Sequence, residues 1–128
     1  MNIELFLKNE ESTNLLGSIF AKILSSYEYG LVVSLKGEMG SGKTTLVRAI
    51  IKELGHVGSV PSPTYTLIEP YNISNKPIYH IDLYRIEEDL ELEFIGWNDF
   101  EVNSLIFIEW PERVHRVYKS SDIMIDFD

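Results

Sequence analysis

The segment 37–44 reads GEMGSGKT and matches the pattern G-x-x-x-x-G-K-[ST]. Its glycines let the backbone curl so that successive N–H groups point inward, which is how a loop cradles phosphate oxygens. Lys43 has the length and charge to reach the outer phosphates of a nucleotide, and the Thr44 hydroxyl is a ligand that Mg²⁺ accepts. The pattern therefore predicts a site for a nucleotide and Mg²⁺. The predicted nucleotide contacts in and just after this loop are Gly37, Gly40, Ser41, Gly42, Lys43, Thr44 and Thr45.

Two acidic residues follow apolar segments and are candidates for binding the Mg²⁺ ion. Asp82 follows the mainly apolar segment 78–81, and Glu109 follows the apolar segment 105–108. A nucleotide-bound Mg²⁺ is held in part by an acidic residue at the end of a nearby apolar strand. Either residue alone could be an ordinary charge at a strand exit, but the presence of both favours a functional pair. Glu109 is the preferred Mg²⁺ partner because the segment before it is more uniformly apolar.

The segment 60–67, VPSPTYTL, combines two prolines with three hydroxyl side chains and a tyrosine. It could place a hydroxyl such as that of Thr64 against the terminal phosphate as a sensor. It could equally be a stiff connection whose hydroxyls satisfy their own backbone. Both interpretations stay open from composition. His80, within the segment 78–81, is interpreted as a packed or solvated strand residue.

The flanks of the glycine loop predict the elements that must position it. The segment 31–35 is short, apolar and rich in β-branched residues, as a buried strand is. The segment 45–54 has its apolar residues on one helical face, and Gly55 supplies a stop. The alternative is a glycine-rich turn that matches by chance, which happens in roughly one chain in a few hundred of this length. The context of strand, loop and helix weakens that alternative further.

Further elements follow from apolar periodicity and turn residues. One helix is expected over 12–26 with Ser12 as its N-cap, and another over 87–95 with Leu90 and Phe94 facing inward. The expected strands are 3–7, 31–35, 65–69, 78–83, 105–108 and 122–127. Helices between apolar strands predict an α/β protein with the P-loop NTPase fold, in which helices flank a mostly parallel central sheet. The site is expected at the carboxyl ends of the strands.

Length and composition limit the class of protein. At 128 residues the chain is predicted to form a single domain over 1–128, and without cysteine it has no disulfide or thiolate metal site. A net charge of −9 disfavours strong direct binding to a nucleic-acid backbone. No apolar run approaches the length of a membrane span, and residues 1–4 lack the basic start of a signal peptide. The expectation is a cytoplasmic protein with no membrane partner.

Four further segments add a specific resemblance to the glycine loop. After GEMGSGKTTL at 37–46, the chain carries SPTYTLIEPY at 62–71, HIDLYR at 80–85, LELEFIG at 90–96 and IEWPER at 108–113. In this order and spacing the segments resemble the TsaE (YjeE) family of small bacterial P-loop ATPases. The resemblance runs through most of the chain. Many families share the glycine loop, whereas the later segments are far more specific.

The resemblance implies a function that composition does not show. Proteins of this family bind and hydrolyse ATP with Mg²⁺ while they associate with TsaD and TsaB. They assist the synthesis of threonylcarbamoyladenosine at position 37 of tRNA, and TsaD performs the transfer. The acidic charge of the chain fits this role, because the partners would handle the tRNA.

The resemblance also implies roles for residues at matching positions. Lys43 and Thr44 would serve phosphate and Mg²⁺, Glu109 would ligate or support Mg²⁺, and Asp82 would be needed for hydrolysis. The segment 62–66 would act as a switch that senses the nucleotide.

Two implications of the resemblance concern the ends of the chain. An acidic residue near the N-terminus, Glu10 or Glu11, would lie near the nucleoside. Many relatives continue well past the final strand, with residues that help to enclose the nucleotide. This sequence stops at Asp128, so that contribution is expected to be missing.

Three alternatives remain open. A small-molecule or nucleoside kinase uses the same type of loop, but usually adds a lid with arginines, and the irregular segment 56–75 has none. A GTP switch protein usually recognises guanine through an N-K-x-D loop, and NKPI at 75–78 lacks the aspartate. The third alternative is a binding subunit that requires the nucleotide without hydrolysing it.

Overall fold

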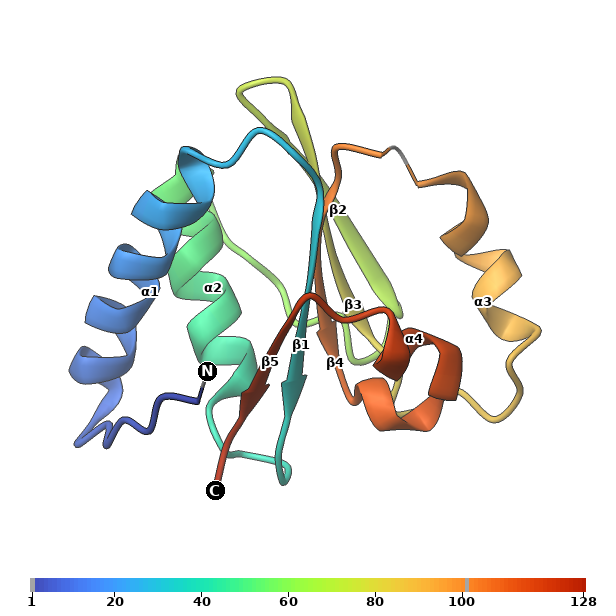
Figure 1. Ribbon diagram of the computed structural model, residues 1–128, viewed down its shortest axis with the longest axis horizontal. Coiled ribbons are helices and arrows are strands. Elements are labelled where there is room, and N and C mark those ends of the chain that lie inside the picture. Colours follow the sequence, from blue (N-terminus) through green and yellow to red (C-terminus); the bar gives the residue numbers. More distant parts are fainter. Residues whose placement is uncertain (1, 101) are drawn as a thin grey trace.

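A five-stranded sheet forms the centre of the protein in a computed structural model that describes residues 2–100 and 102–128 (Figure 1). The strands are β1 (Leu31–Lys36), β2 (Ile68–Ile73), β3 (Lys76–Asp82), β4 (Leu105–Glu109) and β5 (Ile123–Asp126). The helices are α1 (Glu10–Ser25), α2 (Lys43–Leu54), α3 (Glu91–Phe94) and α4 (His115–Lys119), with 3₁₀ turns η1 (Trp97–Asp99) and η2 (Pro111–Arg113).

The strand order β2-β3-β4-β1-β5 places β3, β4 and β1 in the interior of the sheet. β1 runs parallel to both β4 and β5, β3 runs parallel to β4, and only β2 is antiparallel to its neighbour. The predicted α/β class with a mostly parallel sheet is therefore confirmed. Because parallel strands end at the same edge, the carboxyl ends of β1, β3 and β4 meet there.

Helices cover both faces of the sheet. In Figure 1, α1 and α2 pack on one side of the sheet, while α3 and α4 lie on the other. Each face has its own apolar core, as expected for a sheet buried on both sides. The core under α2 includes Leu46, Ile50 and Phe107, and the opposite core includes Ile81, Leu92, Ile108 and Val117.

The close approach of α1 to α2 depends on Gly17. A Cβ added at Gly17 would lie 2.6 Å from the Cβ of Ala49 on α2. Real Cβ atoms do not approach so closely, so the two helices must separate if residue 17 gains a side chain. The absence of a side chain at this position thus sets the distance between the two helices on this face.

Gly17→Ala is therefore expected to lower the free energy of unfolding by about 1–3 kcal/mol, even though alanine favours helix by about 1 kcal/mol. Urea unfolding followed by circular dichroism measures the change. Ala49→Gly should cost about 1 kcal/mol in the wild-type background but restore stability in the Gly17→Ala background. Independent, additive effects of the two substitutions would contradict this account of the contact.

Two expectations for the N-terminal part of the chain are wrong. The segment 3–7 forms no strand, because its backbone pairs with neither edge of the sheet, despite the alternating apolar residues. The first helix begins at Glu10, because the Oδ1 atom of Asn9 accepts the hydrogen bond from the Ser12 backbone N–H at 2.9 Å. Asparagine caps a helix as well as serine does, so the N-cap lies three positions earlier than predicted.

Two later elements also differ from the predicted ones. Residues 63–66 form a turn, closed by a 2.8 Å hydrogen bond from the Leu67 N–H to the Pro63 carbonyl, so β2 starts later than the expected strand at 65–69. The helix expected over 87–95 is reduced to α3, in which Leu92 is buried while Leu90 and Phe94 are exposed. The segment after β4, which adds η2 and α4, was not predicted. In the described part of the chain, no helix has the length and apolar character needed to cross a membrane.

Candidate functional site

The glycine loop 37–44 links the end of β1 to the start of α2, as its sequence context predicts. Gly40 and Gly42 have φ values of 78° and 110°, in the region that favours glycine. Gly42 immediately precedes the helix, so the free N–H groups of the first turn of α2 open toward the loop. Such a helix start, entered through a curled loop, is a site for an anion.

Lys43 is the cation of this loop and is almost completely buried, with 4% exposure. Its Nζ donates hydrogen bonds to the backbone carbonyls of Gly37 and Glu38 and lies 3.9 Å from the centre of the Trp110 ring. No carboxylate is bonded to this ammonium group among the described residues. Its charge is therefore held at the loop by dipoles and an aromatic face, without a neutralising partner.

A pocket with a volume of about 160 Å³ opens at the loop. Residues predicted separately from the glycine pattern and from the acidic positions line it together. They are Gly40, Gly42, Lys43, Thr44, Thr45 and Glu109. The Oγ atom of Ser41 is buried and has no hydrogen-bond partner within the described part of the chain. An unsatisfied buried hydroxyl in the same loop as an uncompensated cation fits a site for phosphate oxygens.

Thr44 and Glu109 form the part of the pocket that suits a divalent cation. The Thr44 Oγ1 atom donates toward the Glu109 carboxylate, at 2.9 Å from Oε1 and 3.0 Å from Oε2, and Glu109 is 3% exposed. Hydroxyl and carboxylate oxygens are ligands that Mg²⁺ prefers. No group of three or more metal-binding side chains occurs among residues 2–100 and 102–128. The arrangement therefore fits Mg²⁺ that completes its shell with phosphate oxygens and water.

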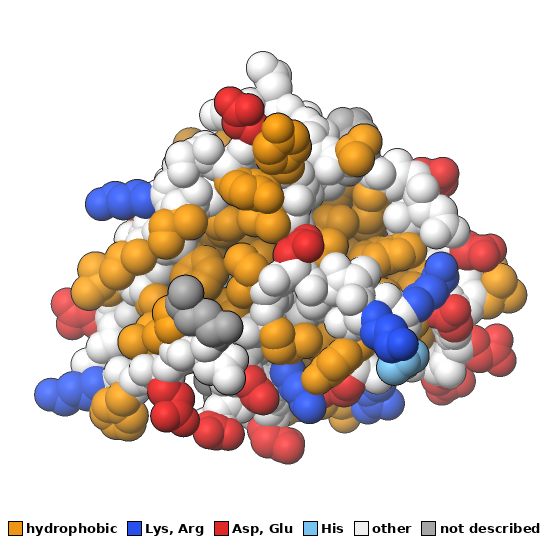
Figure 2. Space-filling view, in the orientation of Figure 1, with side chains coloured by type: hydrophobic (Ala, Val, Ile, Leu, Met, Phe, Trp, Pro, Cys, Tyr) orange, Lys and Arg blue, Asp and Glu red, His pale blue; other side chains and the backbone are white. Residues whose placement is uncertain are grey.

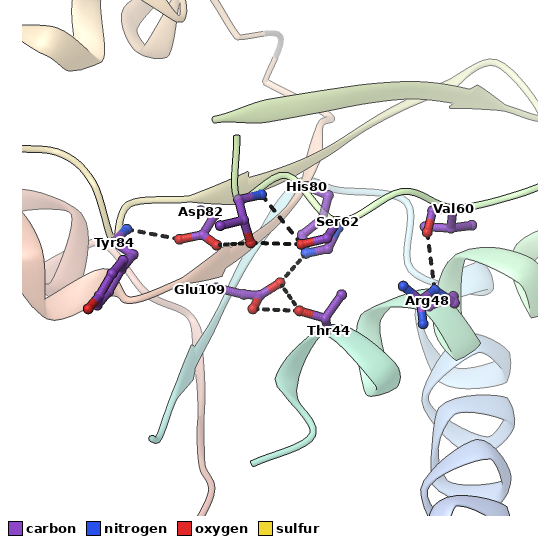
Figure 3. A network of polar contacts seen from close by, with 9 residues as sticks. Thr44, Arg48, Val60, Ser62, His80, Asp82, Tyr84 and Glu109 are labelled. Atoms are coloured by element: carbon purple, nitrogen blue, oxygen red, sulfur yellow. Dashed lines mark hydrogen bonds and ion pairs between the residues drawn. The ribbon is translucent and has the colours of Figure 1, made fainter. Parts of the chain in front are cut away.

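Asp82 lies beside Glu109 because these two residues are register partners at the ends of β3 and β4. Its Oδ1 accepts a 2.9 Å hydrogen bond from the Tyr84 N–H, and its Oδ2 accepts a 3.1 Å bond from Thr64 Oγ1 (Figure 3). The Thr64 hydroxyl thus ties the segment 60–67 to this carboxylate. The structure thereby brings together the residues predicted from the glycine loop, both acidic positions and the proline-containing segment.

Burial raises the pKa of Asp82 above its ordinary value of 3.8, and the neighbouring Glu109 carboxylate adds to the increase. The hydrogen bonds from Tyr84 and Thr64 oppose the change by favouring the ionised form. The net effect is a carboxylate that holds its proton to higher pH than an exposed aspartate does. A raised pKa beside a polar pocket is typical of a group that accepts protons during a reaction.

His80 is the site residue that the sequence analysis missed. Its side chain is fully buried, and its Nε2 atom lies 2.6 Å from Oε2 of Glu109. The one signal in the sequence is its position two residues before Asp82, which puts both side chains on the same face of β3. That signal is weak without the register of β3 against β4.

Glu11 lies apart from the groups that meet at the pocket. It is exposed in the first turn of α1 and belongs neither to the residues that line the pocket nor to the described hydrogen bonds of the site. Its predicted contact with the nucleoside stays a prediction. The same holds for Gly37, whose carbonyl contacts Lys43 but which does not line the pocket.

Asp82→Asn is expected to stabilise the protein increasingly as the pH rises from about 4 to about 7. The folded state has the higher pKa, so the stability that protonated Asp82 contributes is complete below pH 3.8 and is lost as the pH rises through the folded-state pKa. The neutral amide avoids that loss. Urea unfolding of both proteins across this range measures the difference, and a difference that is constant with pH would contradict it.

Comparison with known proteins gives a consistent result. The family model described as "Threonylcarbamoyl adenosine biosynthesis protein TsaE" matches residues 7–128. The chain is 44% identical over 126 residues to the tRNA threonylcarbamoyladenosine biosynthesis protein TsaE of Haemophilus influenzae, covering 96% of this chain and 80% of that protein. The protein of the same name from Aquifex aeolicus is 35% identical over 127 residues, covering 98% and 86% of the two chains.

A solved structure agrees with the sequence relatives. The crystal structure of Bacillus subtilis YdiB matches with a TM-score of 0.61 and 28% identity, covering 85% of this chain and 64% of that chain. The family model covers nearly the whole chain, and the similarity extends through every segment that forms the pocket. The chain therefore belongs to the TsaE family of tRNA threonylcarbamoyladenosine biosynthesis.

Proposed function

We propose that this protein binds and hydrolyses ATP with Mg²⁺ as an accessory subunit in the synthesis of threonylcarbamoyladenosine at position 37 of tRNA. The observation that supports this function is the meeting of Lys43, Thr44 and Glu109 at one pocket. A lone cation, a hydroxyl and a carboxylate at the start of a helix are the groups that a magnesium nucleotide requires.

Each side chain has a task in the proposed reaction. Lys43 and the N–H groups of the glycine loop bind the phosphates and stabilise the charge that moves onto them. Thr44 and Glu109 would hold Mg²⁺, which neutralises charge on the outer phosphates when it is bound. Asp82 would orient the attacking water and take its proton, and its raised pKa suits that role. Thr64 fixes the orientation of the Asp82 carboxylate and links it to the switch segment 62–66.

The hydrolysis by the isolated chain is expected to be slow. No arginine lines the pocket within the described part of the chain, and the guanidinium groups of Arg85 and Arg113 lie over the rings of Tyr65 and Tyr84. An arginine that contacts the transferred phosphate accelerates such reactions by orders of magnitude. A partner that orders the segment 62–66 or supplies a cation would therefore stimulate turnover.

The proposed partners are TsaD and TsaB, and the tRNA would be reached only through the complex that they form. An exposed apolar surface supports association with other proteins. Leu15, Ile19 and Ile23 are 64%, 49% and 63% exposed along α1, on the side of the molecule where Figure 2 shows hydrophobic side chains gathered. The net charge of −9 supports contact with proteins rather than with the tRNA backbone. A cytoplasmic location is consistent with the proposed role in tRNA modification.

Reconstitution tests this function. Phosphate release should require Mg²⁺ and ATP, increase when TsaD and TsaB are added, and accompany the formation of modified tRNA. Counting the ATP consumed per modified tRNA measures how closely the two reactions are coupled. Modification that proceeds at full rate without ATP or without this chain would refute the proposal.

Two control measurements separate the alternative activities. Competition between ATP and GTP for the pocket distinguishes the ATPase from a GTP switch protein. Transfer of labelled phosphate to candidate small molecules or nucleosides, in place of release to water, would identify a kinase.

A further inference from the structure

His80 is a buried polar side chain that the proposed reaction leaves without a role. It lies on β3 between Ile78 and Asp82, on the sheet face whose core includes Phe107 and the apolar side of α2. Its exposure is 0%. A buried imidazole costs free energy unless its polar atoms are hydrogen-bonded. Its Nδ1 atom has no partner within the described part of the chain, so the contact with Glu109 is the bond that His80 makes there.

This contact breaks the symmetry of the Glu109 carboxylate. The Thr44 hydroxyl lies at nearly equal distances from both carboxylate oxygens, 2.9 Å and 3.0 Å, and its single hydrogen does not distinguish between them. The His80 Nε2 atom contacts only Oε2, at 2.6 Å. A carboxylate that ligates Mg²⁺ is ionised and only accepts hydrogen bonds, so in that role of Glu109 the His80 Nε2 atom would carry the hydrogen. The buried His80 imidazole thus holds Oε2, while Oε1 has a hydrogen bond from Thr44.

We propose that His80 is a positioning residue for the metal site. By holding Oε2, it fixes the side chain of Glu109 so that Oε1 and the Thr44 hydroxyl together face the Mg²⁺ of bound Mg-ATP. The inference rests on the proposed function, because it gives Glu109 its Mg²⁺ role. Side chains that orient a metal ligand in this way typically change metal affinity by about 10–100-fold when they are replaced.

The test compares ATP affinity with and without Mg²⁺ in the full-length chain. The ratio of the two dissociation constants, obtained with a fluorescent ATP analogue, is the gain from Mg²⁺. In His80→Leu this gain should fall by about 10–100-fold, while the affinity without Mg²⁺ stays within about threefold of wild type. His80→Gln places an amide N–H near the position of Nε2 and should recover most of the gain.

Phe107→Leu is the matched control for packing. Phe107 is the register partner of His80 on β4 and is fully buried, but its side chain offers no hydrogen bond to Glu109. This substitution should lower the melting temperature and leave the gain from Mg²⁺ unchanged. If Phe107→Leu reduced the gain from Mg²⁺ as much as His80→Leu does, packing would be responsible and the positioning role would be overturned. A gain in His80→Leu equal to that of the wild type would also overturn it.

A spectroscopic measurement on the wild-type protein covers the case in which His80→Leu does not fold. Nitrogen-15 spectra of the imidazole should show that Nε2 carries the hydrogen, and an unprotonated Nε2 would overturn the inference. Wild-type protein whose ATP affinity does not respond to Mg²⁺ would refute the proposed function as well. A wild-type response that persists in His80→Leu refutes the positioning role alone.

Discussion

Lys43→Ala is expected to reduce the rate of ATP hydrolysis at least about 100-fold, because the loop loses its only side-chain cation. The Lys43 ammonium group is buried at the pocket and bonded to two backbone carbonyls, with no carboxylate to neutralise it among the described residues. Because the carbonyl groups are neutral, the positive charge of Lys43 remains available to phosphate oxygens. The neutral variant keeps the N–H groups of the loop, so residual nucleotide binding is expected. Phosphate release at saturating ATP and a nucleotide titration measure the two effects.

Lys52→Ala is the matched control for this prediction. This substitution removes the same charge from the same helix. Lys52 is exposed and lies in the last turn of α2, at the end of the helix opposite the loop. Hydrolysis by Lys52→Ala should stay within about twofold of wild type, as expected for a surface substitution away from the site. If the two variants had equal activity, net charge rather than the position of Lys43 would govern the reaction.

The glycine loop could be predicted from the sequence because all of its determinants are contiguous. The strand before it, the glycines and the helix after it occupy one stretch, and the loop needs no distant residue to curl. The same reasoning predicted that Asp82 and Glu109 each follow an apolar strand. It could not predict their pairing, because the register of β3 against β4 is set by packing across the sheet. The contact of His80 with Glu109 depends on that register and was missed for this reason.

The helix α3 shows where apolar spacing misleads. Leu90 and Phe94 are four residues apart, which in a long helix would place them on one buried face. The actual helix has a single turn, which is too short to present a continuous apolar face. The residue that packs into the core therefore determines which side of the segment faces the sheet. Leu92 fills it and is completely buried, whereas Phe94 is 85% exposed. The segment 3–7 fails similarly, because alternation suits a strand only where a sheet edge pairs with it.

Asp82→Asn is expected to lower the rate of ATP hydrolysis about 10²–10⁴-fold, the range for losing a group that transfers a proton. Asparagine has nearly the same shape, and its carbonyl oxygen can still accept the hydrogen bond from the Tyr84 N–H. It cannot take a proton from water. ATP affinity should change much less than the rate, because Asp82 does not line the pocket formed by the loop. Single-turnover phosphate release and an ATP titration separate the two quantities.

Asp89→Asn provides the control for the loss of a negative charge. Asp89 pairs with Arg116 on the surface, where its side chain is 60% exposed, so its neutralisation should leave hydrolysis unchanged.

Asp82→Asn should be folded and stable at pH 7, since it avoids the cost of burying a charge. That combination makes it the decisive variant in cells that lack the wild-type protein. Restored tRNA modification would mean that the nucleotide acts by binding alone, and loss of modification in a stable protein would mean that hydrolysis itself is required.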